Sequence, residues 1–251
     1  MLRAVTVDFW GTLVLDGPGS DDRYRDRRLA EFESILAGAG LAVSGRRLLR
    51  GYEQSGRELA WIWSENRDVP VLRHVTSILE GAEAGLSARA APETIDALAE
   101  AYARPALLVP PRVAEGARAM LRGLAARGLR LAVVSNTMRT PGVALRKILA
   151  HHGLLDSFQH VTFSDEVGVR KPGAEIFHLT LSRLGAAPGE AVHVGDDAVL
   201  DVRGARRAGL RTVQVVGAGA PAPPTPEDAP DVAIAALAEL PAALAHLEAA
   251  G

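Results

Sequence analysis

The stretch VTVDFWGTL at residues 5–13 constrains the fold more than any other part of this 251-residue chain. Its apolar, β-branched first residues predict a buried strand, and Gly11 allows a sharp backbone turn just beyond Asp8. Open α/β sheets bind their ligands at the carboxyl ends of the strands. The stretch therefore predicts a strand that delivers Asp8 to a functional site, although Asp8 could also simply cap the turn that follows.

A long segment without strand signals follows, from about residue 21 to residue 106. Apolar residues recur there at three- and four-residue spacing, which is typical of amphipathic helices. Breaks at residues 38–40 (GAG), at residues 68–70 (DVP) and at Pro92 divide the segment, so we expect a helical bundle. Trp61 and Trp63 cannot share one helical face, and we expect one to pack inside and the other to face a cleft or a partner.

The remainder of the chain alternates between strands and helices, which favours a parallel sheet. A helix whose apolar face runs from Val113 to Leu124 comes first. We expect strands after it at residues 129–135, 161–164, 191–196, 212–216 and 232–234. The proline-rich segment 220–230 predicts an extended surface loop.

The composition excludes several classes of protein. The chain has no cysteine, so it has no disulfides, thiolate nucleophiles or zinc–sulfur sites. Its net charge of -2 gives no long-range attraction to nucleic acid or to anionic membranes. No apolar run reaches the roughly 18 residues that a membrane span needs, and no signal peptide pattern precedes the first strand. We therefore expect a cytoplasmic protein with no nucleic-acid or membrane partner.

Four polar clusters follow predicted strands or lie in the loops just after them. They are Asp8, the pair Ser135-Asn136, Lys171 within Arg170-Lys171-Pro172, and the acidic group of Asp196, Asp197 and Asp201. Carboxylates from different strands, here Asp8 and Asp196, can hold a hard divalent cation such as Mg²⁺. Lys171, Ser135 and the backbone amides of Phe9 and Trp10 would supply the donors that a transferring phosphoryl group needs. Together the clusters indicate phosphoryl chemistry at one edge of the sheet.

Each cluster also has a purely structural interpretation. Ser135 and Asn136 can cap a strand–helix junction, and a lysine is often a solvated surface charge. Asp197 and Asp201 can cap the helix that follows them. The surface interpretation of Lys171 is weakened because the chain has only one other lysine, Lys147. We place Asp201 behind the direct metal ligands and leave Asp197 unassigned.

These motifs resemble those of the haloacid dehalogenase superfamily of hydrolases, in the branch whose helical cap is inserted between the first two motifs. Residues 8–12 (DFWGT) resemble the first motif, Ser135 the second, Lys171 the third, and residues 195–201 (GDDAVLD) the fourth. The resemblance implies an α/β fold in which residues 1–15 and 108–251 form a Rossmann-like parallel-sheet core flanked by helices. Residues 16–107 would form the inserted all-helical cap domain.

The resemblance also implies the roles of individual residues. Asp8 would be the nucleophile that forms an aspartyl-phosphate, with Lys171 as the second catalytic residue. Mg²⁺ would be held by Asp8, Asp196 and the backbone carbonyl of Trp10, with Asp201 in the same metal group. Substrate binding would fall to Phe9, Trp10, Thr12, Ser135 and Asn136.

Trp10 departs from the pattern of the phosphatases in this superfamily, which usually carry a second aspartate there as general acid and base. Indole cannot take that role at neutral pH. His74 or Glu58 of the cap could supply the proton instead. Two other branches are excluded: phosphonate-cleaving members need a lysine in the cap, which residues 16–107 lack, and membrane ATPases need spanning helices.

The 2-haloacid dehalogenases tolerate an aromatic residue at this position, use no metal, and resemble a Ser-Ser-Asn pattern where this chain has GDD at residues 195–197. Neighbouring carboxylates beside Asp8 need a cation to remain ionised. We therefore predict a Mg²⁺-dependent hydrolase of a small phosphorylated metabolite. A 2-haloacid dehalogenase-type hydrolase and a catalytically weak phosphate-ligand-binding homologue remain alternatives, and the sequence predicts neither the substrate nor the oligomeric state.

Overall fold

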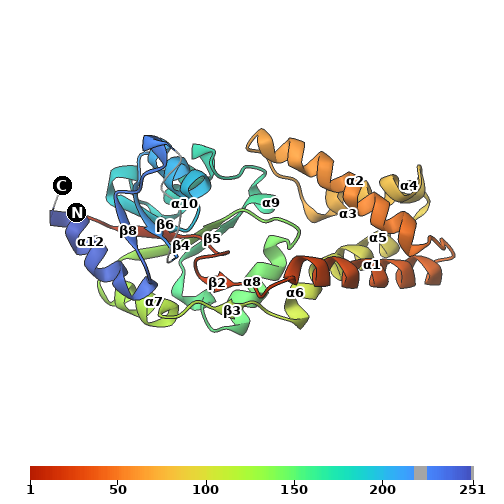
Figure 1. Cartoon of the computed structure of the whole chain (residues 1–251), viewed down its shortest axis with the longest axis horizontal. Coiled ribbons are helices and arrows are strands. Elements are labelled where there is room, and N and C mark those ends of the chain that lie inside the picture. The colour runs from red at the N-terminus through yellow and green to blue at the C-terminus, as the bar shows by residue number, and fades with distance from the viewer. Residues whose placement is uncertain (218–224, 250–251) are drawn as a thin grey trace.

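A parallel β-sheet forms the centre of the larger lobe in the computed structural model, which describes residues 1–217 and 225–249 (Figure 1). The strand order is β5-β4-β1-β6-β7-β8, and every neighbouring pair is parallel. The strands are β1 (Ala4–Val7), β4 (Arg130–Ser135), β5 (His160–Phe163), β6 (Ala191–Gly195), β7 (Arg211–Val215) and β8 (Val232–Ile234). Each lies within one residue of its predicted position, and the predicted α/β fold is confirmed.

Helices cover both faces of this sheet because successive side chains of a strand point to opposite faces. Val5 and Val7 of β1 pack with α7 (Ala117–Ala126), α8 (Gly142–His151) and α12 (Leu240–Ala249). Ala4 packs on the other face with α10 (Ala174–Leu184) and α11 (Gly204–Arg207). Shorter elements complete this lobe: α9 (Ser164–Val167), the π-helical turn η3 (Ala198–Arg203), and the 3-10 turns η1 (Leu155–Ser157), η2 (Pro188–Glu190), η4 (Pro226–Asp228) and η5 (Leu237–Glu239).

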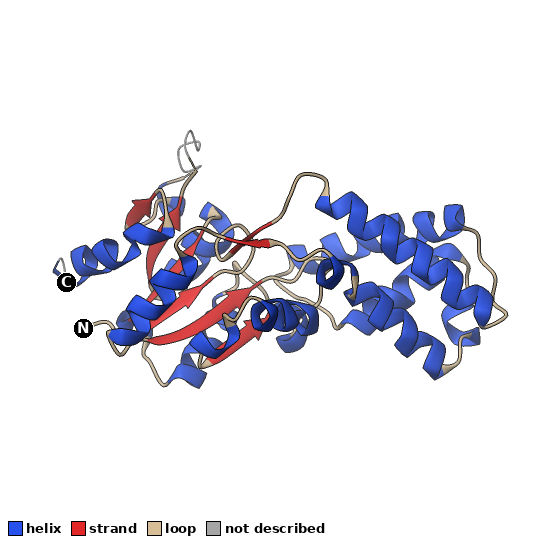
Figure 2. Ribbon diagram, turned by 90° about the horizontal axis from the view of Figure 1, so that it is seen from below, coloured by secondary structure: helices blue, strands red, loops and turns tan. Residues whose placement is uncertain are grey.

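The second lobe consists of helices and loops alone in the described residues, as Figure 2 shows. It contains α1 (Ser20–Gly38), α2 (Gly45–Ser64), α3 (Val71–Ala82), α4 (Leu86–Arg89), α5 (Pro92–Ala103) and α6 (Pro105–Leu108), with an apolar core of its own. Helices α2 and α3 approach closely at Gly51, where a Cβ atom would lie 2.2 Å from the carbonyl oxygen of Ile78. The predicted breaks after residue 38 and before Val71 and Pro92 match these helices.

Two short strands join the lobes and were not predicted. Strand β2 (Val14–Leu15) pairs antiparallel with β3 (Arg112–Val113), so the chain leaves and re-enters the sheet lobe at adjacent points. The assignment of Val113 to a helix was wrong, because α7 begins only at Ala117, after Gly116 with φ 78°. Two-residue strands carry no periodic signal, and this pairing joins residues almost a hundred positions apart.

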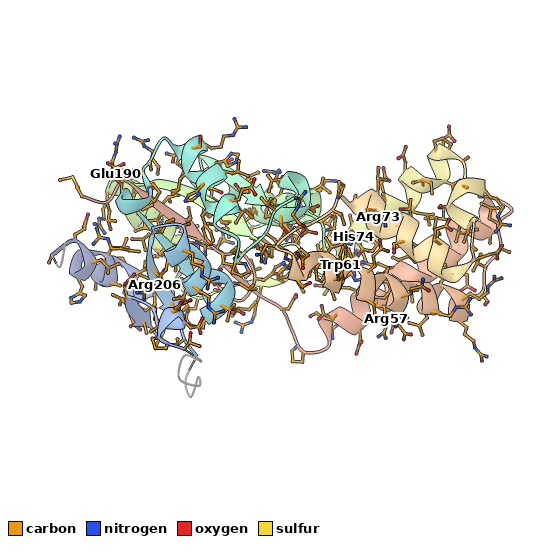
Figure 3. The ribbon with its side chains drawn as sticks, turned by 90° about the horizontal axis from the view of Figure 1, so that it is seen from above. Arg57, Trp61, Arg73, His74, Glu190 and Arg206 are labelled. Carbon is orange, nitrogen blue, oxygen red and sulfur yellow. The ribbon has the colours of Figure 1, made fainter. Side chains whose placement is uncertain are left out.

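Three other predictions concern the surface. Trp63 is half-buried and lines a cleft, as expected for one of the two tryptophans. Trp61 on α2 (Figure 3) is 69% exposed, so the expectation that the other one packs inside was wrong. Residues 220–224 of the proline-rich segment lie outside the described residues, and residues 225–230 are described and contain the 3-10 turn Pro226–Asp228. Within the described ranges, no helix is both long and apolar enough to cross a membrane.

Candidate active site

A cleft of about 800 Å³ lies between the carboxyl edge of the sheet and the helical lobe. The parallel register sets Val7 level with both Val133 and Val194, so the segments after β1, β4 and β6 meet at one edge. Residues from all four predicted clusters line the cleft: Asp8, Ser135, Asn136, Lys171, Asp196, Asp197 and Asp201. The arrangement is the one that ligand sites of parallel sheets use.

Lys171 lies buried between two carboxylates. Its Nζ atom is 2.6 Å from Asp8 Oδ1 and 2.6 Å from Asp201 Oδ1, and the residue is only 2% exposed. The side chain of Asn136 fixes the backbone of Lys171. Its Nδ2 atom donates to the Lys171 backbone carbonyl at 3.0 Å, and its Oδ1 atom accepts from the Lys171 backbone amide at 2.9 Å. Lys171 is therefore no surface charge, and Asn136 positions it.

Asp201 forms the inner end of a buried hydrogen-bond chain that sequence reasoning missed. Its Oδ1 atom lies 3.0 Å from His193 Nε2, and His193 Nδ1 lies 2.8 Å from the Thr6 hydroxyl. Burial alone would raise the pKa of Asp201, but Lys171 and His193 hold it well below its usual range. Burial lowers the pKa of His193, so the imidazole adds no positive charge. Polar residues on strands that are otherwise apolar were the available signal.

Two further carboxylates keep their charge less easily than Asp201. Burial raises the pKa of Asp8 to about 7, and the charge of Asp201 adds to this although Lys171 opposes it. Partial desolvation in the cleft and the charge of Asp201 raise the pKa of Asp196 to about 6. Oxygen atoms of the three carboxylates lie within 4.8 Å of one another. Lys171 pairs with two of these carboxylates, and Asp196 has no ion-pair partner in the described residues, so a divalent cation fits this donor set.

The backbone around Gly11 is shaped to admit Asp196. Gly11 has φ 75°, and a Cβ atom there would lie 2.4 Å from Asp196 Oδ2. The Thr12 hydroxyl donates to Asp196 Oδ1 at 3.2 Å, and the Gln214 side chain donates to the Asp196 carbonyl at 2.9 Å. Thr12 was predicted to bind substrate, but in this structure its hydroxyl orients Asp196.

The remaining predicted binding residues differ in what they present to the cleft. Phe9 is fully buried, with its ring 6.4 Å from that of Phe163, so only its backbone can meet a ligand. Trp10 lines the cleft and meets the Phe9 ring edge-on at 4.9 Å. In the described part of the chain, the Phe9 and Trp10 amides donate to no other backbone carbonyl. Ser135 is buried and lines the cleft.

The structure also shows what Asp197, His74 and Glu58, whose roles were left open, contact. Asp197 caps the following turn, because its side chain accepts from the amides of Val199 and Leu200, each at 2.8 Å. His74 is buried in the helical lobe with Nδ1 2.9 Å from the Tyr102 hydroxyl, and Glu58 accepts from Ser77 at 2.5 Å. Neither His74 nor Glu58 lines the cleft.

Two of the known proteins that are similar in sequence to this chain are phosphatases. The phosphoserine phosphatase of Thermus thermophilus is 39% identical over 158 residues, which are 63% of this chain and 61% of that protein. The glyceraldehyde 3-phosphate phosphatase of Methanopyrus kandleri is 44% identical over 78 residues, which are 30% of this chain and 34% of that protein. The chain therefore matches less than two thirds of the length of either relative.

The whole fold is shared with solved structures. A 2-haloacid dehalogenase from Pseudomonas syringae superposes with a TM-score of 0.72 at 23% identity, covering 98% of this chain and 100% of that chain. At this identity the likeness concerns the fold and not the reaction. The sequence model of the haloacid dehalogenase-like hydrolases matches residues 2–209, and this chain belongs to that family of hydrolases.

Proposed function

We propose that this hydrolase removes phosphate from a small phosphorylated metabolite, with Asp8 as the nucleophile. The observation that carries the proposal is the charge of the site, where three carboxylates lie together and only one ammonium group, paired with Asp8 and Asp201, offsets them. A metal-free dehalogenase would have to keep Asp196 beside its nucleophile without an ion-pair partner in the described residues, and such a charge raises the pKa values of both groups and opposes attack. The two relatives described above are phosphatases of small phosphorylated compounds, which supports the same assignment.

Mg²⁺ would be held by Asp8, Asp196 and the backbone carbonyl of Trp10, with Asp201 behind them. When bound, it would supply positive charge that offsets the carboxylates and the substrate phosphate. Asp201 would act mainly by fixing Lys171, since it hydrogen-bonds both Lys171 and His193.

The chain's own residues account for the remaining chemistry. One Asp8 oxygen attacks phosphorus, the bond from phosphorus to the leaving oxygen breaks, and an aspartyl-phosphate forms. Lys171 and the backbone amides of Phe9 and Trp10, which donate to no backbone carbonyl in the described residues, offset the charge on the peripheral phosphate oxygens. Water then attacks the aspartyl-phosphate, which releases inorganic phosphate and restores Asp8. The helical lobe forms the side of the cleft opposite the sheet and would limit the access of bulk water.

A panel of phosphomonoesters, assayed with Mg²⁺ and with EDTA, tests this proposal. We expect phosphate release that EDTA abolishes and that Asp8→Asn eliminates without loss of the folded state. Metal-independent release of halide from 2-haloacids would instead assign the dehalogenase reaction. Binding of phosphate and Mg²⁺ with no turnover on any ester would assign the binding-only alternative.

A further inference from the structure

Arg28 occupies the side of the cleft formed by the helical lobe. It belongs to α1, is 2% exposed, and its Nε donates to the Tyr102 carbonyl at 2.8 Å. Its Nη2 donates to the Arg139 carbonyl at 2.7 Å and to the Thr140 hydroxyl at 3.2 Å. All these acceptors are neutral, so the contacts orient the guanidinium group without neutralising it.

Arg139 approaches the same point from the sheet lobe. It lies in the loop after β4, four residues beyond Ser135, and lines the same cleft. Its guanidinium group lies 4.0 Å from the ring centre of Tyr52 and donates to the Tyr52 carbonyl and to the Ser55 hydroxyl, each at 3.0 Å. The Tyr52 hydroxyl also lies 3.4 Å from Arg28 Nη1. Both guanidinium groups therefore adjoin Tyr52.

No acidic side chain compensates these two charges within residues 1–217 and 225–249, because neither arginine forms an ion pair there. Arg170, which is similarly buried, does have a partner in Asp68 at 3.3 Å. Burial, together with the charges of Arg139 and Arg28, lowers the pKa of the nearby His74 to about 3. This region of the cleft wall is thus positively charged without a protein counter-ion.

The acidic residues of the cleft rim lie elsewhere. Asp21 and Asp22 are in the first turn of α1, about 10 Å along the helix from Arg28. Asp22 pairs with Arg25 at 2.8 Å, and Asp16 accepts from the Tyr24 hydroxyl at 3.3 Å. Asp22 and Asp16 are thus engaged locally, and none of the three acids forms an ion pair with Arg28 or Arg139 in the described residues.

We propose that Arg28 and Arg139 bind a second anionic group of the substrate, a carboxylate or a phosphate, beside the Tyr52 hydroxyl. The inference rests on the proposed function, since it places the scissile phosphate at Asp8 in the same cleft. A buried charge is costly unless it is paired, and the planar guanidinium fork matches both carboxylate and phosphate oxygens. The substrates are then phosphate esters with an acidic group at the far end.

A matched pair of aryl phosphates tests this assignment. 4-Carboxyphenyl phosphate and 4-carbamoylphenyl phosphate have similar shapes and phenol leaving groups, and differ in the remote charge. We expect kcat/KM to be about tenfold to hundredfold higher for the carboxylate, as for a charge-assisted hydrogen bond. 1,4-Phenylene bisphosphate shows whether a remote phosphate is preferred to a remote carboxylate. Equal kcat/KM for the carboxylate, the bisphosphate and the amide would overturn the proposal.

Variants separate binding of the anion from a merely structural bridge between the lobes. Arg139→Gln should remove the preference for the charged compound, and Arg139→Lys should restore part of it. Arg57→Gln, on the exposed surface of the same helix as Tyr52, should keep the preference (Figure 3). If Arg139→Gln lowered activity on both compounds equally, the arginine would only hold the lobes together, and the proposal would fail.

Binding to the Asp8→Asn protein keeps the test independent of turnover. Isothermal titration with Mg²⁺ present should give a Kd about tenfold or more lower for 4-carboxyphenyl phosphate than for the amide. If the wild type showed no turnover but the Kd were lower for 4-carboxyphenyl phosphate, the proposed function would be contradicted and the anion subsite would be supported. Equal Kd values would remove the subsite and leave the proposed function to the phosphoester panel.

Discussion

Replacing Trp10 by aspartate probes the chemical step most directly. Trp10 lines the cleft two residues after Asp8, and its indole ring cannot exchange a proton with a leaving group at neutral pH. Wild type should therefore cleave esters of acidic alcohols and phenols far faster than simple alkyl phosphates. Trp10→Asp should reduce this dependence on the acidity of the leaving group.

The size of the expected gain follows from the role that the new carboxyl group takes. General acid catalysis contributes about 10² to 10⁴ in rate, or about 3 to 5 kcal/mol of barrier. The charges of Asp8 and Asp196 nearby would raise the pKa of the new group and keep it protonated, as an acid requires. Loss of the half-buried indole and its edge contact with Phe9 should cost about 2 kcal/mol of folding stability.

The assay compares kcat/KM across aryl phosphates of graded phenol acidity and one alkyl phosphate. Trp10→Asn is the matched control, because it creates the same cavity without a transferable proton. On the alkyl phosphate we expect Trp10→Asp to exceed Trp10→Asn by about 10²-fold or more. Thermal unfolding of both variants would show whether they lose similar stability.

A different outcome would show that another group already supplies the proton. His74 and Glu58 do not line the cleft, whereas Asp16 does, and burial raises the pKa of Asp16 above its ordinary value. A shallow leaving-group dependence in wild type that Asp16→Asn makes steep would assign the proton to Asp16. Equal activity of Trp10→Asp and Trp10→Asn on alkyl phosphates would refute the reasoning outright.

Three further predictions concern charge and backbone geometry. Lys171→Ala should lower kcat/KM by about 10²-fold or more, because two buried carboxylates lose their cation. Lys147→Ala, on the exposed side of α8, is the control and should have little effect. Equal losses in the two variants would contradict this role of Lys171. Gly11→Ala should raise the Mg²⁺ concentration for half-maximal activity by about tenfold or more, because the added Cβ atom would displace the Asp196 carboxylate. An unchanged Mg²⁺ dependence of the activity would contradict the assignment of Asp196 as a metal ligand. Burial raises the pKa of Asp165 in the folded state to about 6, while the unfolded chain releases that proton near pH 3.8. The contribution of Asp165 to the unfolding free energy should therefore fall by about 3 kcal/mol as pH rises from about 4 to about 6. In urea denaturation Asp165→Asn should make the fall in unfolding free energy smaller by about this amount, while Asp8 and Asp196, whose pKa values are also raised, keep part of it. An unchanged fall in the variant would contradict the role of Asp165.

The parts of the structure that could be predicted are those with a local signal. The apolar runs that form β1, β4 and β6 are strands with polar residues directly after them, and parallel pairing brings those ends together without further information. The helix breaks at residues 38–40 and at Pro92 depend on local backbone preferences. Asp8 and Asp196 could be named for the same reason, because each directly follows such a strand, whereas Lys171 was named because the chain has only one other lysine and because its segment resembles a family motif.

The parts that could not be predicted depend on contacts between distant residues. The pairing of β2 with β3 joins residues 14–15 to 112–113, and neither strand is long enough to be recognised alone. The link from Thr6 through His193 to Asp201 needs the register of two neighbouring strands. Arg28 is an ordinary helix residue in the sequence, and only the packing of α1 against the loop at Arg139 places it at the cleft.

The position of Lys171 in the site also depends on contacts between distant residues. The residue before it, Arg170, donates its amide to the carbonyl of Asn66 at 3.0 Å and pairs with Asp68, and both partners belong to the helical lobe. The residue after it, Pro172, packs so closely on α11 that a Cβ on Gly204 would lie 2.9 Å from its Cα. The ammonium group that bridges two carboxylates is thus held by contacts from both lobes. Docking of the helical lobe and alignment of Lys171 therefore use the same few residues, so the position of the helical lobe and the geometry of the site depend on each other.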